Sequence, residues 1–318
     1  MPGTPNTAPL GNTGMEITQV GFGAWAIGGG DWEFGWGPQD DDESVAAIHG
    51  AVELGVNWID TAAGYGFGRS EVTVGRALGE LPSSRRPYVF TKAGILPGPD
   101  GKVIRTIEHD SVIREAHASL ERLGVDAIDL YQIHWPIPDA EIEAGWGAFA
   151  ELKEQGLVRH IGVSNFDVAQ LLRVQQIAPV ESLQPPYSLL DRKIETELLP
   201  FADEHGIGVI VYSPMASGLL TGGMTRERIE AFPDNDWRKR SARFQEPQLT
   251  ANLALVERLR AVADRHGTTP GSVAIAWTLR NPAVDAAIVG FRRPDQVDPI
   301  LAGLDVELTA DELEEIGR

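Results

Sequence analysis

The sequence contains no cysteine, and this absence excludes disulfide bonds, thiolate nucleophiles and cysteine-ligated metal sites. Positive charge is also scarce, because 27 Lys and Arg residues stand against 46 Asp and Glu, for a formal net charge of -19. Binding to nucleic acid or to an anionic membrane depends on clustered cations, so neither partner is expected. We predict a small-molecule partner instead, and an anionic cofactor would need a local basic patch.

Long hydrophobic runs are missing as well. No apolar segment approaches the roughly 20 residues that a membrane-spanning helix needs. The opening stretch "MPGTPNTAPLGNTG" has neither a charged beginning nor an apolar centre, so it is not predicted to be a signal peptide. A cytoplasmic protein is therefore the expectation. The seven histidines form no H-x-H or H-E-x-x-H pattern, and we predict no metal site.

Short apolar runs alternate with amphipathic segments along the chain. Helical periodicity is present, for example, over 43–55 and 113–124, and each of these segments ends in glycine. Near-continuous apolar strands that alternate with helices indicate a parallel sheet covered on both faces. The predicted strands are 19–24, 57–61, 88–93, 128–134, 159–164, 182–185, 208–213 and 286–290.

Eight such units at this chain length favour a closed barrel. We predict an α/β fold, a (β/α)8 TIM barrel, as a single domain over residues 1–318. The segment 10–20, "LGNTGMEITQV", is typical of a β-hairpin ahead of the first barrel strand. Extra helices are expected near the C-terminus, including 309–317, which starts with a capping-box pattern. The long segment 214–247 is rich in glycine and charge and is a candidate lid.

One motif points in a misleading direction. "GFGAWA" (21–26) matches the G-x-G-x-x-A fingerprint of dinucleotide-binding sheets. That fingerprint requires a helix to begin at the glycines, whereas here "IGGGDWEFGWG" follows, with too many glycines for a helix. A Rossmann site is therefore not predicted.

Polar residues follow three consecutive predicted strands. Asp60 ends the second strand, Lys92 the third and His134 the fourth. Adjacent strands lie about 4.8 Å apart, so the three side chains are expected within roughly 10 Å at the face where barrel active sites lie. Tyr65 follows Asp60 in a glycine-rich loop that can turn its ring inward. Each residue alone has an ordinary structural explanation, but a buried Lys92 needs a carboxylate partner, and Asp60 is adjacent.

Together these four residues can donate a proton. A lysine ammonium beside a phenol stabilises the phenolate and lowers the pKa of the phenol. Asp60 would hold Lys92 charged, His134 and Tyr65 would both face one carbonyl oxygen, and Tyr65 would act as general acid. No side chain supplies a hydride, so a nicotinamide cofactor must.

The remaining strand ends can accommodate such a cofactor. Ser164, Asn165 and Gln184 could hold a carboxamide, although Ser164 and Asn165 could equally cap the following helix. Tyr212 could stack on a nicotinamide ring. The last strand is followed by Gly290, Phe291, Arg292 and Arg293, and the two arginines either bind a ribose phosphate or simply face solvent.

The sequence resembles the aldo-keto reductases over nearly its whole length. "WIDTAAGYGFGRSE", "VFTKAG", "LYQIHWP", "IGVSNF", "QPPYSLLDR" and "VYSPMASGLLTGG" all look like family motifs, in order. "WAIGG" and "YSPMASGLLTGG" are similar to the bacterial branch of the inositol-locus and general-stress reductases. The resemblance implies a (β/α)8 barrel, NADP(H), and reversible reduction of a carbonyl compound without metal.

The resemblance also assigns site residues. It implies a catalytic tetrad of Asp60, Tyr65, Lys92 and His134. The implied cofactor-binding positions are Gly23, Ala24, Trp25, Asp60, Ser164, Asn165, Gln184, Tyr212, Ser213, Pro214, Met215, Ser217, Gly218, Leu219, Gly290, Arg292 and Gln296. The chain departs from the family at Ile300, where an asparagine often lies near the adenine, and this weakens the expectation of NADPH over NADH.

The substrate pocket is predicted to contain indole rings. Trp25, Trp32 and Trp135 lie on segments at the expected catalytic face, as does Trp36. Indole walls favour apolar or aromatic carbonyl compounds or stacking on sugar rings, although Trp32 and Trp36 could merely pack a loop. The basic run 238–243 could cover a pyrophosphate or form an ordinary exposed helix.

Two other functions are open from the sequence. The same barrel could bind cofactor as a regulatory or sensor subunit, or Lys92 could form a Schiff base as in an aldolase. The sequence does not specify an oligomeric state and is compatible with a monomer.

Overall fold

The computed structural model describes residues 6–301, 303 and 305–317. The opening stretch is not predicted to be a signal peptide. Its first five residues lie outside the described residues. No helix within the described ranges combines the length and apolar character that crossing a bilayer requires.

Eight parallel strands form a closed barrel, which confirms the predicted fold class. Around the barrel the order is β10, β11, β12, β3, β4, β5, β8 and β9. Every predicted strand is present, and each observed bound lies within one residue of the predicted one. The barrel strands are β3 (Val20–Gly23), β4 (Trp58–Asp60), β5 (Tyr88–Ala93), β8 (Ile128–Ile133), β9 (Val158–Ser164), β10 (Ser182–Gln184), β11 (Gly208–Tyr212) and β12 (Ala286–Gly290).

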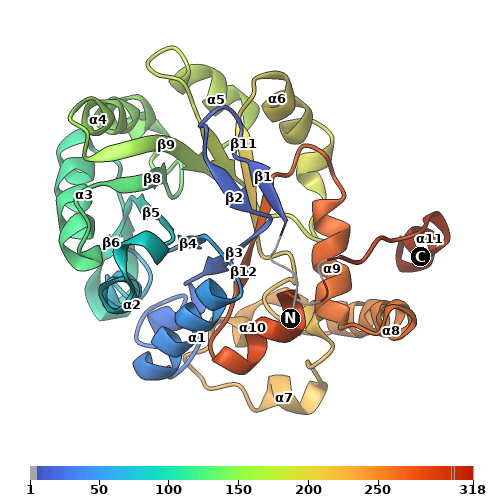
Figure 1. Ribbon diagram of the computed structural model, residues 1–318. Coiled ribbons are helices and arrows are strands. Elements are labelled where there is room, and N and C mark those ends of the chain that lie inside the picture. Colours follow the sequence, from blue (N-terminus) through green and yellow to red (C-terminus); the bar gives the residue numbers. More distant parts are fainter. Residues whose placement is uncertain (1–5, 302, 304, 318) are drawn as a thin grey trace.

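Helices surround the barrel (Figure 1). The first begins where Asp40 accepts hydrogen bonds from the backbone N–H groups of Asp42 and Glu43, and acidic residues fill its first turn, where they complement the helix dipole. The longer helices are α1 (Asp41–Glu53), α2 (Arg69–Glu80), α3 (His109–Leu123), α4 (Ile142–Glu154), α8 (Gln248–His266) and α9 (Pro270–Leu279). The shorter ones are α5 (Val168–Val174), α6 (Leu198–Glu204), α7 (Arg226–Glu230), α10 (Val297–Leu301) and α11 (Ala310–Gly317).

The predicted N-terminal hairpin closes one end of the barrel. Its strands, β1 (Thr7–Pro9) and β2 (Glu16–Thr18), pair antiparallel, and Figure 1 shows them lying across the ring of strands. Leu10 and Ile17 pack in one buried cluster with Trp58, whose indole N–H donates to the Thr18 carbonyl at 2.8 Å. The same cluster contains side chains from other barrel strands: Phe90, Leu130, Ile210, Ala286 and Ile288. The barrel interior is therefore a packed core rather than a channel.

A second hairpin, which the sequence reasoning did not predict, follows β5. Its strands β6 (Ile95–Pro97) and β7 (Val103–Arg105) pair antiparallel, with Ile95 opposite Arg105. Because β5 ends at the catalytic face of the barrel, the hairpin projects beside the barrel mouth.

The segment 214–247, predicted as a lid, contains α7 and three 3₁₀ helices, η6 (Leu219–Thr221), η7 (Trp237–Arg240) and η8 (Ala242–Phe244). Its apolar side chains share a buried cluster with α8. The segment also contacts the loop after β3, where the Trp237 backbone N–H donates to the Gly35 carbonyl at 3.0 Å. It therefore forms part of the wall around the barrel mouth.

Candidate active site

The four residues predicted as catalytic meet at the mouth of the barrel. Their strands β4, β5 and β8 are consecutive neighbours, as predicted. Asp60 is the last residue of β4 and His134 directly follows β8, whereas β5 continues one residue beyond Lys92. Tyr65 lies in the turn after β4, and its backbone N–H donates to the Ala62 carbonyl at 3.1 Å.

Lys92 is at the centre of the cluster and is almost completely buried. Its Nζ donates to Asp60 Oδ1 at 2.6 Å, to the Thr61 carbonyl at 2.9 Å and to the Tyr65 hydroxyl at 3.3 Å. An ammonium has three hydrogens to donate, so these three acceptors use all of them. The ammonium is thereby fixed against the phenol oxygen, as the sequence reasoning expected.

The electrostatics differ from the expectation in one respect. Burial raises the pKa of Tyr65 well above its ordinary value, and the Asp60 carboxylate adds to this shift. Burial likewise raises the pKa of Asp60 and lowers that of Lys92, and in both cases the attraction between the two groups opposes the shift. The direction of this pKa shift is opposite to the one predicted from Lys92 alone, and burial is its main cause. The phenol is held in its protonated form, which is the form that a general acid must have.

His134 faces the Tyr65 ring edge-on, with 5.4 Å between ring centroids and an interplanar angle of 79°. Its Nδ1 is buried without a hydrogen-bond partner among the described residues. Burial lowers the pKa of His134 well below its usual value, and the positive charges of Lys92 and Arg105 lower it further. The imidazole is therefore neutral, and it can donate a hydrogen bond to a carbonyl oxygen without carrying a charge.

Polar side chains of the neighbouring strands support this cluster. Gln184 Nε2 donates to Asp60 Oδ2 at 2.9 Å, and Ser164 Oγ donates to the Gln184 carbonyl at 2.8 Å. Asn165 Nδ2 donates to the His134 carbonyl at 2.9 Å, and Asn165 Oδ1 accepts from the Tyr212 hydroxyl at 2.8 Å. The cap of the following helix is Asp167, which forms a capping box with Gln170. Ser164 and Asn165 are thus free of the capping role that the sequence left open.

Backbone strain accumulates at the same face. Several non-glycine residues there have positive φ, including Asn165 at 64° and Ser213 at 58°. Ala216 and Ser217, in the loop after β11, also have positive φ, at 47° and 58°. Left-handed backbone costs about 1–3 kcal/mol for such residues, and it persists where the surroundings hold it, often at ligand-binding sites.

The residues predicted for the adenine end lie after β12. Gly290 pairs with Gly23 across β12 and β3, and a side chain at Gly290 would meet only the Gly23 carbonyl, at 3.8 Å. These two strand ends therefore present bare backbone at the mouth. Gln296 Oε1 accepts from the Arg292 backbone N–H at 2.8 Å. Ile300, the departure from the family pattern, is buried in the core.

The two arginines after β12 differ in their surroundings. The Arg292 guanidinium is partly exposed and donates to Gln39 Oε1 at 2.6 Å and to the carbonyls of Trp36 and Pro38. Arg293 is exposed and pairs with Asp295 at 3.2 Å.

Aromatic rings form a wall around Tyr65. Trp25 lies nearly parallel to Tyr65 with 6.2 Å between centroids, and Trp32 is 6.3 Å from the same ring. Trp36 packs edge-on against Trp25 at 5.3 Å, one shell further out. Trp135 directly follows His134 and is half-buried. The structure thus places Trp25 and Trp32 around Tyr65, and Trp36 packs against Trp25.

Sequence reasoning missed one member of this wall, Trp237. It stacks on Trp25 at 5.3 Å with an interplanar angle of 15°. Its neighbour Arg238 pairs with the buried Asp236 at 2.6 Å and lies over the Trp36 ring at 4.4 Å. The basic run 238–243 is therefore not an ordinary exposed helix. The signal that could have identified Trp237 is an indole at the head of that run within a segment already predicted to cover the mouth.

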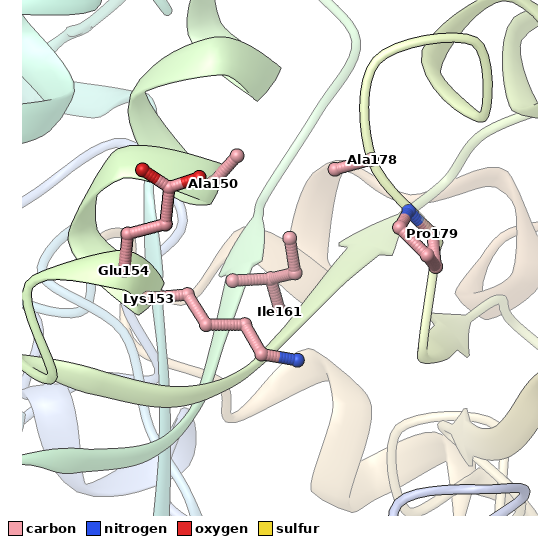
Figure 2. A pocket seen from close by; sticks show the side chains of 6 residues that line it. All are labelled: Ala150, Lys153, Glu154, Ile161, Ala178 and Pro179. Atoms are coloured by element: carbon pink, nitrogen blue, oxygen red, sulfur yellow. The ribbon is translucent and has the colours of Figure 1, made fainter.

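A surface depression beside the aromatic wall measures about 530 Å³ and is lined by Glu33, Phe34, Asp100, Gly101, Lys102, Trp237, Arg240 and Ser241. A different depression, shown in Figure 2, measures about 340 Å³ and is lined by Ala150, Lys153, Glu154, Ile161, Ala178 and Pro179, none of them a predicted site residue. Among the described residues, no group of three or more His, Asp or Glu side chains is arranged to hold a metal ion.

Comparison with known proteins gives one consistent result. The model of the "Aldo/keto reductase family" matches residues 19–318. The aldo-keto reductase YhdN of Bacillus subtilis is 37% identical over 292 residues, which cover 92% of this chain and 86% of that protein. The NADH-specific methylglyoxal reductase of Escherichia coli is 35% identical, covering 95% of this chain and 94% of that protein.

Solved structures agree. The glycerol dehydrogenase of Gluconobacter oxydans superimposes with a TM-score of 0.86 at 37% identity, covering 98% of this chain and 93% of that one. A holo aldo-keto reductase of Bacillus halodurans gives a TM-score of 0.78 at 25% identity, covering 98% and 95% of the two chains. With the family model matching nearly the whole chain, this protein belongs to the aldo/keto reductase family.

Proposed function

We propose that this chain reversibly reduces aldehydes and ketones to alcohols with NADP(H), using Tyr65 as the general acid. The observation that carries the proposal is the buried chain of contacts from Asp60 through Lys92 to the Tyr65 hydroxyl, at 2.6 and 3.3 Å. A cytoplasmic location is part of the same proposal, and cell fractionation tests it.

Each residue has a distinct role in the proposed reaction. A reduced nicotinamide, when bound, supplies the hydride for the carbonyl carbon. The neutral His134 donates a hydrogen bond to the carbonyl oxygen and orients it. Tyr65 transfers its hydroxyl proton to that oxygen as negative charge develops there. Lys92, held by Asp60, stabilises the phenolate that is left, and in the oxidation direction the same phenolate accepts the proton.

The residues at the mouth fit a nicotinamide cofactor. Ser164 and Gln184 pair across β9 and β10, and the Asn165 side chain donates to Ser164 Oγ, so polar side chains that can bind a carboxamide gather there. Open space beside the Gly290 backbone allows a flat or phosphate-bearing group to approach closely. Arg292 and Arg293 follow directly and would hold a ribose phosphate.

The geometry of Lys92 favours this proposal over Schiff-base chemistry. A Schiff base requires a free lone pair on Nζ. Burial lowers the pKa of Lys92, which alone would suit an aldolase, but all three N–H directions point at acceptors. A carbonyl carbon would have to displace one of these partners to reach the nitrogen.

Replacing the acid tests the mechanism. Tyr65→Phe removes the proton but keeps the ring, and general acid catalysis contributes about 10²–10⁴-fold, so kcat should fall by that factor. NADPH consumption with an aromatic aldehyde measures it. The matched control is Tyr88→Phe at the opposite end of β5, which should keep wild-type turnover.

Turnover near the wild-type rate in a folded Tyr65→Phe variant would overturn the mechanism. A wild-type protein that retains cofactor tightly but turns over no aldehyde or alcohol of a broad panel would instead point to the regulatory role.

The cofactor preference is tested separately. One of the related proteins is described as NADH-specific. The preference of this chain for NADPH over NADH must therefore be measured. We expect Arg293→Ala to lower kcat/KM with NADPH about tenfold or more, because charge-assisted hydrogen bonds contribute about 1.5–3 kcal/mol, while NADH is little affected. Arg85→Ala, exposed at the other end of the barrel, is the control. Equal losses with both cofactors would contradict a role in phosphate recognition.

A further inference from the structure

Arg105, the last residue of β7, has no established role, and its surroundings are unusual for an arginine. Its Nε is buried without a hydrogen-bond partner. No hydrogen bond or ion pair joins the Arg105 side chain to any other described residue. Arg85 and Arg114 also lack such partners, but both are exposed and therefore hydrated. Arg105 is only partly exposed, so much of its hydration is lost and not replaced, which is costly for a charge.

The side chain faces the catalytic cluster. Side chains alternate between the two faces of a strand, so Val103 and Arg105 share one face of β7 and Ile104 the other. Ile104 is 48% exposed, whereas Val103 packs against the cluster of Trp32, Ala62 and Tyr65. The face of β7 that carries Arg105 is therefore the face turned to the barrel mouth.

Two further observations place Arg105 beside the reacting groups. Its cross-strand neighbour Ile95 lies against Gly64, the residue before Tyr65, where a side chain at Gly64 would meet Ile95 at 2.7 Å. The positive charge of Arg105 also contributes, after burial and Lys92, to lowering the pKa of His134.

Arg105 is not on the side proposed for the cofactor phosphates. Its hairpin follows β5, and in the order of the closed barrel β5 lies four strands from β11, which is the opposite side. The loop after β11 and the arginines after β12 are the proposed cofactor elements. Arg105 is thus across the mouth from them, where the rest of a carbonyl substrate must extend.

We propose that Arg105 binds a carboxylate on the substrate, so that the preferred substrates are carbonyl compounds carrying an acid group near the reacting carbon. This inference rests on the proposed carbonyl reduction. A guanidinium presents a planar fork of donors that matches a carboxylate, and the pair forms best where water is excluded. Val103, on the same face of β7, and the cluster of Trp32, Ala62 and Tyr65 against which it packs provide an apolar environment near Arg105. A bound substrate carboxylate would accept the hydrogen bonds of the Arg105 guanidinium, which has no acceptor among the described residues.

Matched substrates test the assignment. The isomers 2-, 3- and 4-formylbenzoate differ in the distance from carbonyl to carboxylate, and their methyl esters keep the shape without the charge. We expect the wild type to favour at least one acid over its ester by tenfold or more in kcat/KM. Arg105→Met should abolish the preference by raising KM for the acid while the ester is unaffected, and Arg105→Lys should retain part of it.

The control is Arg86→Met, which removes the same charge from an exposed residue just before β5, about 20 Å along the strand from Lys92. It should keep the acid preference. The proposal is overturned if the wild type does not favour any acid, or if Arg105→Met still favours one.

A binding measurement separates this proposal from the function on which it rests. If neither acid nor ester is turned over, the proposed function fails, and titration of 4-formylbenzoate against tryptophan fluorescence still reports on Arg105. Binding that is weakened tenfold or more in Arg105→Met and unchanged in Arg86→Met supports the carboxylate site. Equal binding by both variants, or none by the wild type, refutes it.

Discussion

At the scale of single residues, two carboxylates, those of Glu71 and Glu115, hold the strand that carries Lys92. Glu71 is fully buried and accepts from Thr91 Oγ1 and from Arg122 Nε, each at 2.6 Å. Glu115, on α3, accepts from the Gly94 backbone N–H at 3.0 Å. Because Thr91 and Gly94 flank the end of β5, these carboxylates fix the backbone that carries Lys92.

Glu115 gives the molecule a pH-dependent stability. Burial raises the pKa of Glu115 to about 7 from an ordinary value of 4.5, although hydrogen bonds from Gly94 and Ser111 oppose the shift. The folded state therefore holds an extra proton, and the stabilisation present below pH 4.5 is lost as pH rises through 7. We expect Glu115→Gln, which mimics the protonated form, to gain about 2.5 kcal/mol relative to wild type between pH 5 and 8.

Urea unfolding of both proteins at pH 5 and pH 8 measures this difference. Glu121→Gln, on the exposed face of the same helix, removes an equal charge and should track the wild type at both pH values. A constant difference between Glu115→Gln and wild type across this range would show that Glu115 titrates alike in the folded and unfolded chain.

At the scale of elements, the closed end of the barrel depends on the contact between β3 and β4. A side chain at Gly21 would lie 2.2 Å from the Trp58 indole, which is itself fully buried against the hairpin. We expect Gly21→Ala to destabilise the protein by about 1–3 kcal/mol through overpacking. Gly50→Ala, in α1 with nothing within 4 Å, should instead stabilise it by roughly 0.5–1 kcal/mol.

Thermal unfolding followed by circular dichroism compares the two glycine variants. Opposite signs are the expected result. A Gly21→Ala protein as stable as Gly50→Ala would mean that the Trp58 ring can move aside, and the end of the barrel is looser than its packing suggests.

The elements also show what a sequence can and cannot predict. The eight barrel strands were predictable because short apolar runs alternate with amphipathic segments along the chain. The β6–β7 hairpin was not, although "ILPGPDGKVIR" has two short apolar runs around a turn. These two strands lie outside the alternation of strands and helices that identified β4 and β10, which are equally short, and only their pairing, with Arg105 opposite Ile95, reveals them.

At the scale of the whole molecule, the site is assembled from segments far apart in the chain. Tyr65, Lys92 and His134 were predictable as neighbours because the strand order of a barrel follows the sequence. The stacking of Trp237 on Trp25 depends on how two long loops meet over the mouth, and no local pattern specifies that. The reversed direction of the Tyr65 pKa shift has the same origin, since burial depends on all surrounding segments at once.

The N-terminal hairpin closes one end of the barrel and so restricts how molecules reach the catalytic residues. Leu10 and Ile17 pack in one buried cluster with Trp58 and close that end of the barrel. The dinucleotide and the carbonyl compound must therefore both reach the site through the mouth of the barrel. Whichever of them sits deeper has to arrive first and depart last, so steady-state kinetics should follow a compulsory order rather than a random one.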